Sequence, residues 1–219
     1  MTTPLSIASL VPLAYVIGSI PFGLLVGLAK GVDPRKAGSG NIGATNVGRL
    51  LGGKFFALVF TLDLLKGMIP MLITGALMNA FNAPPGATLL LVWLGVGFAA
   101  VLGHNYSLFL KFKGGKGVAT SCGVALGLFP YFTLPALVSA LTFMVVFKFT
   151  RYVSLGSIVA AVAFPVFYIF IGVSQGWDVV GAQWPLLAFA LLICFMIVYK
   201  HRTNISRLRA GTENKFVKK

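Results

Sequence analysis

The sequence predicts an all-α integral membrane protein, and three observations carry this prediction. Hydrophobic residues make up 58% of the 219 residues, only 10% are charged, and the mean hydropathy is +0.92. A soluble domain of this length cannot bury so large an apolar fraction. The apolar residues also fall into runs of about 20 residues, the length at which a helix crosses the hydrocarbon core. We therefore expect a single polytopic membrane domain over residues 1–219.

Five apolar runs are long enough to predict membrane helices directly, and each is bounded by Gly, Pro, Asn or basic residues. They are 5–29, 55–78, 87–110, 153–173 and 183–199. The segment 117–147 differs, because a single helix of that length would be roughly 46 Å long, against a hydrocarbon core of about 30 Å. A glycine and two prolines also interrupt it. We expect two short helices there, 117–129 and 131–147, of which the first is short enough to be re-entrant.

Basic residues predict the orientation of these helices, because short cytoplasmic loops of membrane proteins are enriched in Lys and Arg. Seventeen of the eighteen Lys and Arg residues lie in four segments, which are 30–54, 111–116, 148–151 and the tail from Lys200. The connections 79–86 and 174–182 contain neither residue type. Placing all four basic segments on one side requires an even number of crossings between Lys116 and Lys148. We therefore expect a seven-helix transmembrane bundle with the N-terminus outside and the C-terminus in the cytoplasm.

The first predicted cytoplasmic loop contains AGSGNIGATNVGR, residues 37–49, in which Gly38, Gly40 and Gly43 formally match GxGxxG. The dinucleotide fingerprint needs a preceding strand and a βαβ unit, so a loop between membrane helices does not qualify. The glycines still let backbone N–H groups approach an anion, and Arg49 has a guanidinium fork that suits phosphate. The polar side chains that could assist are Ser39, Asn41, Thr45 and Asn46. A glycine-rich turn with a purely structural role is the alternative.

The second predicted cytoplasmic loop contains GHNYSLFLKFKGGKGVAT, residues 103–120. It is not a P-loop, because Gly117 stands where Ser or Thr is required and Leu110 stands where the first glycine is required. A helix is nevertheless expected to begin here, and Lys116 is flanked by Gly114, Gly115 and Gly117. Backbone N–H groups and an ammonium can therefore face one anion, which we expect to be a phosphate.

Lys66 is the one basic residue inside a predicted membrane helix, with Asp63 one turn before it. A charge near the bilayer centre costs about 2.5 to 3.5 kcal/mol on insertion scales, so such a residue is a functional candidate. The alternative is a buried Asp63–Lys66 pair that supports the bundle. His104 and Asn105 lie near the cytoplasmic end of another helix, where His104 either forms a structural hydrogen bond or takes part in catalysis.

Two further polar stretches lie on the same predicted side of the membrane. RYVSLGS, residues 151–157, places Ser154 and Ser157 one turn apart at a helix start, where hydroxyls either cap N–H groups or bind a ligand. KHRTNISR places His201, Asn204 and Arg207 along one face of the continued last helix. This stripe offers donors for an anionic substrate.

Acidic residues are too few and too far apart to form a metal site for catalysis. The four are Asp33, Asp63, Asp178 and Glu213, so no carboxylate cluster exists to hold Mg²⁺ as in the CDP-alcohol phosphotransferases. We expect no metal and no other cofactor. The HxxxxD signature of acyltransferases that use acyl-CoA or acyl carrier protein is also missing. A His–carboxylate base is therefore not expected.

Several of these stretches, in order along the whole chain, resemble the cytoplasmic motifs of the bacterial acyl-phosphate-dependent glycerol-3-phosphate acyltransferases, the PlsY family. The matching stretches are GSGNIGATNVGR, LDLLKG, GHNYSLFLKFKGGKGVAT, RYVSLGSI, HRTNISRL and GTENK. The resemblance implies a seven-helix enzyme of the bacterial cytoplasmic (inner) membrane, with its active site facing the cytoplasm. Its reaction would be the first acylation of phospholipid synthesis. An acyl group would pass from acyl phosphate to the sn-1 hydroxyl of glycerol 3-phosphate, giving lysophosphatidate and phosphate.

With this resemblance, we expect direct acyl transfer without an acyl-enzyme intermediate. The expected catalytic residues are Ser39, Arg49, Lys116, Ser154, His201 and Asn204. The expected substrate-binding residues are Gly38, Gly40, Asn41, Gly43, Thr45, Asn46, Lys66, His104, Asn105, Gly114, Gly115 and Gly117. Two proton acceptors stay open, His201 and a substrate phosphate. The expected partners are acyl phosphate, glycerol 3-phosphate and membrane lipids, and not nucleic acid.

A transporter for phosphorylated solutes is a second interpretation, because it would also need basic, glycine-rich openings. Transporters usually place ligand groups near the bilayer midplane and contain internal repeats. Here the polar stretches are expected at one surface, and no convincing repeat is found. A non-catalytic binder of anionic lipids is a third interpretation. The enzyme prediction depends on one condition, which is that the four polar stretches meet in one cationic pocket.

Overall fold

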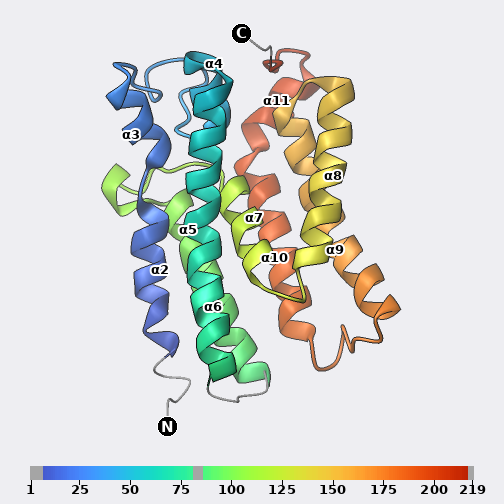
Figure 1. Cartoon of the computed structure of the whole chain (residues 1–219). Helices are drawn as coiled ribbons and strands as arrows, with labels where there is room; N and C mark the ends of the chain where they lie inside the picture. The colour runs from blue at the N-terminus through green and yellow to red at the C-terminus, as the bar shows by residue number, and fades with distance from the viewer. Residues whose placement is uncertain (1–6, 81–85, 217–219) are drawn as a thin grey trace.

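The computed structural model describes residues 7–80 and 86–216, and the regular secondary structure of these residues is helical, which confirms the all-α class (Figure 1). The helices are α2 (Leu10–Ser19), α3 (Phe22–Ala29), α4 (Ala44–Leu51), α5 (Gly53–Ala80), α6 (Ala87–Asn105), η1 (Leu108–Leu110), α7 (Val118–Gly127), α8 (Thr133–Thr150), α9 (Val153–Ser174), α10 (Trp184–Lys200) and α11 (Arg202–Arg209). Within the described ranges, five stretches are long and apolar enough to cross a membrane, or six if α10 and α11 count as one bent span. Seven passes and their orientation stay a prediction.

The first predicted span, 5–29, is broken into α2 and α3, and its first two residues lie outside the described part of the chain. The break follows from Pro21, which lacks an N–H and pushes the residue before it out of the helical region. Ile20 has φ −60° and ψ 117°, which is extended backbone. The exposed Ile20 carbonyl accepts a hydrogen bond from Lys66 Nζ at 2.8 Å. Lys66 therefore stabilises the break.

The segment 117–147 contains α7 and most of α8, which runs back along the bundle after a turn, and α7 is too short to cross a membrane (Figure 1). Its ten residues span only about 15 Å, half of a hydrocarbon core. α7 lies in the interior of the bundle beside α5 (Figure 1). The two backbones touch, because a Cβ on Gly123 would lie 2.0 Å from the Leu64 carbonyl oxygen and one on Gly67 2.3 Å from that of Thr120. Small residues thus fix the position of α7 and of the turn before it.

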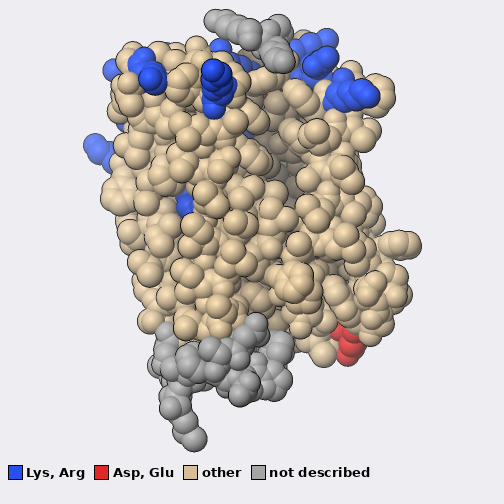
Figure 2. Space-filling view, viewed as in Figure 1, with Lys and Arg blue, Asp and Glu red and all other residues tan. Residues whose placement is uncertain are grey.

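Basic side chains and exposed apolar side chains lie on different parts of the surface. Lys and Arg gather at the end of the bundle that carries α4 and α11, whereas the acidic surface in the same view lies at the opposite end (Figure 2). Large apolar side chains cover the flanks, and Phe149 and Phe170 are 79% and 73% exposed. Such flanks suit contact with lipid, and the basic end suits a membrane surface facing the cytoplasm.

Candidate active site

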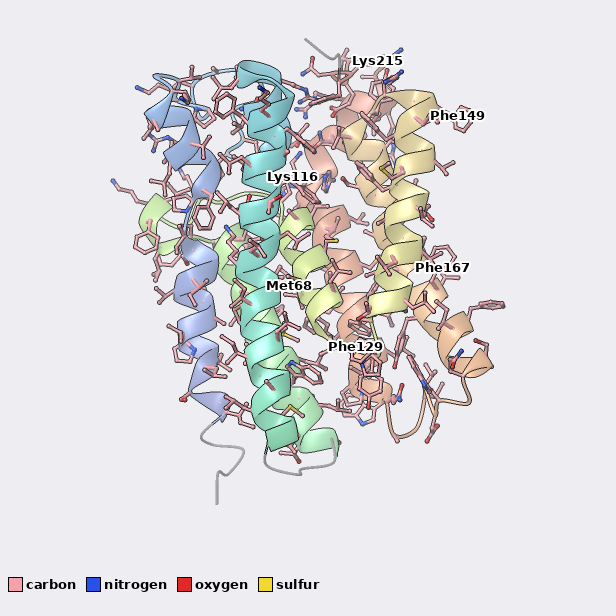
Figure 3. All side chains as sticks on the ribbon, viewed as in Figure 1. Met68, Lys116, Phe129, Phe149, Phe167 and Lys215 are labelled. Atoms are coloured by element: carbon pink, nitrogen blue, oxygen red, sulfur yellow. The ribbon has the colours of Figure 1, made fainter. Side chains whose placement is uncertain are left out.

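A cavity of about 520 Å³ brings together polar residues from the four stretches singled out in the sequence. They come from the first loop with α4, from the turn before α7, from the start of α9, and from the end of α10 with α11. Figure 3 shows Lys116 inside the bundle, well below the level of Lys215 at its basic end. Lys116 therefore lies below the surface of the basic end, whereas Ser39 in the same lining is exposed.

Twelve of the eighteen predicted site residues line the cavity, namely Ser39, Asn41, Gly43, Thr45, Asn46, Arg49, His104, Lys116, Gly117, Ser154, His201 and Asn204. The other six are Gly38, Gly40, Lys66, Asn105, Gly114 and Gly115, which lie outside the lining and contact residues that form or neighbour it. The roles assigned to all eighteen remain predictions. The structure shows which of their polar side chains already have hydrogen-bond partners within the protein.

The first loop is folded around the buried side chain of Asn46. Its Oδ1 accepts the Ser39 backbone N–H at 2.8 Å, and its Nδ2 donates to three backbone carbonyls within residues 34–41 at 2.8 to 3.0 Å. Gly38 and Gly40 have φ of +61° and +71°, which residues with a Cβ rarely adopt. A Cβ on Gly38 would also lie 2.3 Å from Asn46 Oδ1. Asn46 and these glycines therefore shape the loop.

Arg49, on α4, lines the cavity and has one buried donor without a partner among the described residues. Its Nη2 donates to the Asn214 carbonyl at 2.9 Å, whereas its Nε is buried without a hydrogen-bond partner among the described residues. Burial lowers the pKa of Arg49 and the nearby Glu213 carboxylate opposes this effect, but a guanidinium stays charged in proteins. A buried donor without a partner is costly, so an anion at this position would be favourable.

Lys116 is presented by a tight turn that leads into α7. The Gly114 and Gly115 N–H groups donate to the carbonyls of Asn105 and His104 at 3.2 and 3.0 Å. Burial lowers the pKa of Lys116 to about 8, although a nearby carboxylate opposes the shift. The first residues of α7 also line the cavity, and the N–H groups of a helix start carry partial positive charge. Ammonium and helix terminus thus offer one anion site.

Glu213 lines the cavity, although no role was predicted for it from the sequence. Its Oε1 accepts hydrogen bonds from Ser154 Oγ at 2.8 Å and Asn204 Nδ2 at 2.7 Å, and its Oε2 accepts from Arg207 Nε at 2.7 Å. Burial alone would raise the pKa of Glu213, but these hydrogen bonds outweigh it and lower the pKa. Asn204 Oδ1 in turn accepts from Lys116 Nζ. The sequence feature that could have indicated a role for Glu213 is that it is the one acidic residue in an otherwise basic tail.

His201 lies at the junction of α10 and α11, buried in the cavity wall. Its Nδ1 lies 2.7 Å from the Ile197 carbonyl oxygen, so the proton sits on Nδ1 and Nε2 is left as an acceptor. The hydroxyl hydrogen of Ser157, in contrast, is already used, because the hydroxyl donates to the Val153 carbonyl. Ser121 was missed in the sequence: it lines the cavity, and its buried hydroxyl has no partner among the described residues.

The remaining lining is apolar and comes mainly from α7, α8, α9 and α10. It includes Phe132, Phe164 and Phe189, whose rings pack with centroids 5.0 Å apart for the first pair and 6.3 Å for Phe132 with Phe189. Met144 also lines the cavity and is 61% exposed, so the cavity reaches the outer face of the bundle at α8. One cavity therefore combines a cationic part with a part that suits a hydrocarbon chain. No cluster of three or more potential metal ligands occurs in the described ranges.

Comparisons with known proteins point to one family. Residues 8–211 match the family model described as glycerol-3-phosphate acyltransferase. The chain is 46% identical over 208 residues to the glycerol-3-phosphate acyltransferase of Geobacter sulfurreducens, which covers 94% of this chain and 96% of that protein. It is 44% identical over 207 residues to the glycerol-3-phosphate acyltransferase of Aquifex aeolicus, and this alignment covers 94% of this chain and 97% of that protein.

Two solved structures of PlsY, an integral membrane glycerol 3-phosphate acyltransferase, are similar to the whole fold. The glycerol 3-phosphate form has a TM-score of 0.82 at 43% identity, and the lysophosphatidic acid form has 0.79 at 42%. Each alignment covers 97% of this chain and 96% of the other.

Proposed function

Since the chain belongs to the glycerol-3-phosphate acyltransferase family, we propose that its cavity transfers the acyl group of an acyl phosphate to the sn-1 hydroxyl of glycerol 3-phosphate. The chain is an integral membrane acyltransferase, and the reaction would give lysophosphatidate and inorganic phosphate. The observation that carries the proposal is the two-part cavity, in which Arg49 and Lys116 line the polar part and three packed phenylalanine rings line the apolar part. Two phosphorylated anions, one with a hydrocarbon chain, fit this division.

The polar part supplies donors for two phosphates. Arg49 Nε has no partner among the described residues, and Lys116 shares its ammonium with an amide oxygen and not with a carboxylate. The backbone N–H groups at the start of α7 add donors that need no side chain. Hydrogen bonds between charged groups are about twice as strong as neutral ones. These groups would hold both substrates and keep the hydroxyl close to the acyl carbon.

Once both substrates are bound, acyl transfer requires few further protein groups. The hydroxyl oxygen attacks the acyl carbonyl carbon, and the bond from that carbon to the phosphate oxygen breaks with its electron pair leaving on inorganic phosphate. Because the acyl phosphate is already activated, no protein nucleophile is needed, and positioning supplies much of the rate. The hydroxyl proton passes to His201 Nε2 or to a phosphate oxygen. Cationic donors would stabilise the charge that develops on the acyl and phosphate oxygens.

The acyl chain would lie in the apolar part, between α7, α8, α9 and α10. The exposure of Met144 supports lateral access from the lipid, because an acyl donor held in the bilayer could enter there without crossing water. The gathering of Lys and Arg near the polar part supports a bacterial inner-membrane enzyme whose active site faces the cytoplasm (Figure 2).

Incubating the purified protein with an acyl phosphate and glycerol 3-phosphate tests the proposal. We expect lysophosphatidate and inorganic phosphate in equal amounts, and neither product when glycerol 3-phosphate is left out. Arg49→Ala and Lys116→Ala should each reduce the rate strongly, and wild-type rates in both would reject the electrostatic part. Uptake of glycerol 3-phosphate into vesicles without phosphate release would indicate a transporter. A covalent acyl-protein trapped with labelled acyl phosphate would reject direct transfer.

A further inference from the structure

Three charged or ionisable side chains form a buried cluster next to the polar part of the cavity, and the reaction described above gives them no role. Asp63 and Lys66 lie one turn apart on α5, and His104 lies at the end of α6. They are 3%, 4% and 5% exposed. Lys66 Nζ lies 2.7 Å from Asp63 Oδ1, and His104 Nδ1 lies 3.6 Å from the same oxygen.

The cluster is only partly satisfied. Asp63 Oδ1 is paired with Lys66 Nζ, whereas His104 Nδ1 has no hydrogen-bond partner within the described residues, and both Asp63 and His104 line the cavity. Lys66 does not line the cavity, and among the described residues it also donates to the Ile20 carbonyl and lies over the face of the Phe22 ring. Lys66 therefore acts on Asp63 and not on a substrate. Its charge offsets a carboxylate that would otherwise repel two phosphorylated substrates.

Stability alone does not account for these charges. A buried ion pair is often no more stabilising than apolar side chains of similar volume, and charges inside a membrane segment are costly. The Asp63–Lys66 pair also has a neighbour in the cavity wall, because Asp63 faces the Nδ1 side of the His104 ring. The other side of that ring contacts the turn that presents Lys116.

The contact between His104 and the turn is close. A Cβ on Gly115 would lie 2.2 Å from His104 Nε2, so the ring rests on the Gly115 backbone. The same histidine accepts the Gly115 N–H on its carbonyl oxygen. Lys116 is the next residue, and the start of α7 follows. A change in the tilt of the His104 ring is therefore transmitted to the anion site.

We propose that Asp63, balanced by Lys66, is a positioning residue that orients the His104 ring and through it the turn that presents Lys116 to a substrate phosphate. The proposal rests on the proposed function, because the anion at the turn is one of the two substrates. Loss of Asp63 should move the Lys116 ammonium away from the phosphate that it binds. A hydrogen bond between charged groups contributes about 10-fold to 100-fold in binding, so the loss should appear as weaker binding of a phosphorylated substrate.

The double variant Asp63→Asn/Lys66→Met separates positioning from stability. Each single variant leaves a buried charge without a partner, so each should lower the thermal midpoint, whereas the double variant should recover it. The double variant carries no net change in charge. We expect it to keep a raised KM, by about 10-fold to 100-fold, for at least one of the two phosphorylated substrates, with a smaller effect on kcat. Recovery of both the midpoint and wild-type KM values would overturn the proposal, and so would a loss confined to kcat.

Gly115→Ala disturbs the same contact from the other side. It should raise the same KM, and adding it to the double variant should give less than the product of the separate effects, because both changes act on one contact. Gly53→Ala is the matched control, since a Cβ there meets nothing within 4 Å. Fully multiplicative effects would contradict the proposal. Wild-type protein that forms no lysophosphatidate would instead reject the proposed reaction, whatever the variants do.

Discussion

Lys116 Nζ donates a hydrogen bond to Asn204 Oδ1, which joins the turn before α7 to α11 across 88 positions of the sequence. Asn204 is held in turn by Glu213, to which its Nδ2 donates at 2.7 Å. The ammonium is thus fixed by a neutral amide, and the carboxylate lies one step further away. This arrangement places the positive charge without neutralising it, so the charge stays available to a phosphate.

The pH dependence of kcat/KM should show the titration of Lys116. Burial lowers its pKa to about 8, so the ammonium is present below this pH and is lost above it. Binding of an anion therefore weakens as pH rises through about 8, and kcat/KM should fall there, since this ratio reports groups of the free enzyme. The second ionisation of a phosphate monoester, with a pKa of about 6, is nearly complete by then. Lys116→Arg should be less active but lack this fall, because a guanidinium does not titrate in this range. The same alkaline fall in Lys116→Arg would assign it to another group.

Asn204→Asp should weaken substrate binding while making Lys116 harder to deprotonate. A carboxylate beside the ammonium favours its charged form and competes with the phosphate for it. We expect a KM raised by about 10-fold or more, from the loss of one hydrogen bond to a charged group, and an alkaline limb displaced to higher pH. Steady-state kinetics across pH 6 to 10 measures both. A displaced limb with unchanged KM would show that Lys116 does not contact the substrate.

Glu213→Ala should destabilise the basic end of the bundle, because it leaves Arg207, Asn204 and Ser154 without their shared acceptor. Ser154 and Asn204 are buried, and each unsatisfied buried group costs about 1 to 3 kcal/mol, whereas the more exposed Arg207 should contribute less. A thermal unfolding scan should show the loss. Hydrogen bonds lower the pKa of Glu213 below 4.5, so its contribution is present above that pH and is lost as pH falls through the lowered value. Glu213→Gln keeps the shape and should remove this acid dependence. An unchanged acid dependence in Glu213→Gln would assign it elsewhere.

Phe164→Leu should shift the preference for acyl chain length. Phe164 lines the apolar part and packs on Phe132, so a smaller side chain makes room for more of the hydrocarbon. One buried methylene contributes about 0.8 kcal/mol, or roughly fourfold. The ratio of kcat/KM for long to short acyl phosphates should therefore rise several-fold. Phe170→Leu is the control, because Phe170 is 73% exposed on the same helix and does not line the cavity. Equal ratios in both variants would place the chain elsewhere.

Local patterns in the sequence were sufficient for the fold class and for the polar stretches. Apolar runs of membrane length are a property of neighbouring residues, and so is a glycine pair beside Lys116. The break at Ile20 was missed because Pro21 sits in a run that is apolar throughout, and hydropathy does not register a missing N–H. Residues close together in the chain could be interpreted from their own context.

Contacts between segments that are far apart in the chain could not be predicted from local sequence patterns. Glu213 looked like an isolated acid in a basic tail, and its role depends on Ser154, 59 positions away. Asn46 was predicted to bind substrate, and the hydrogen bonds by which its side chain also holds the loop could not be foreseen. The pairing of Asp63 with Lys66 was one of two interpretations that their spacing left open, and the contact of Asp63 with His104 depends on how α5 and α6 pack.

In the proposed reaction, the opening beside Met144 would give the two products separate exits from the cavity. Inorganic phosphate can return to water through the basic end, while the lysolipid can slide sideways into the leaflet without its chain ever becoming wet. Release of one product then need not wait for the other. An enzyme built in this way hands its lipid directly to the two-dimensional pool in which a following acylation would meet it.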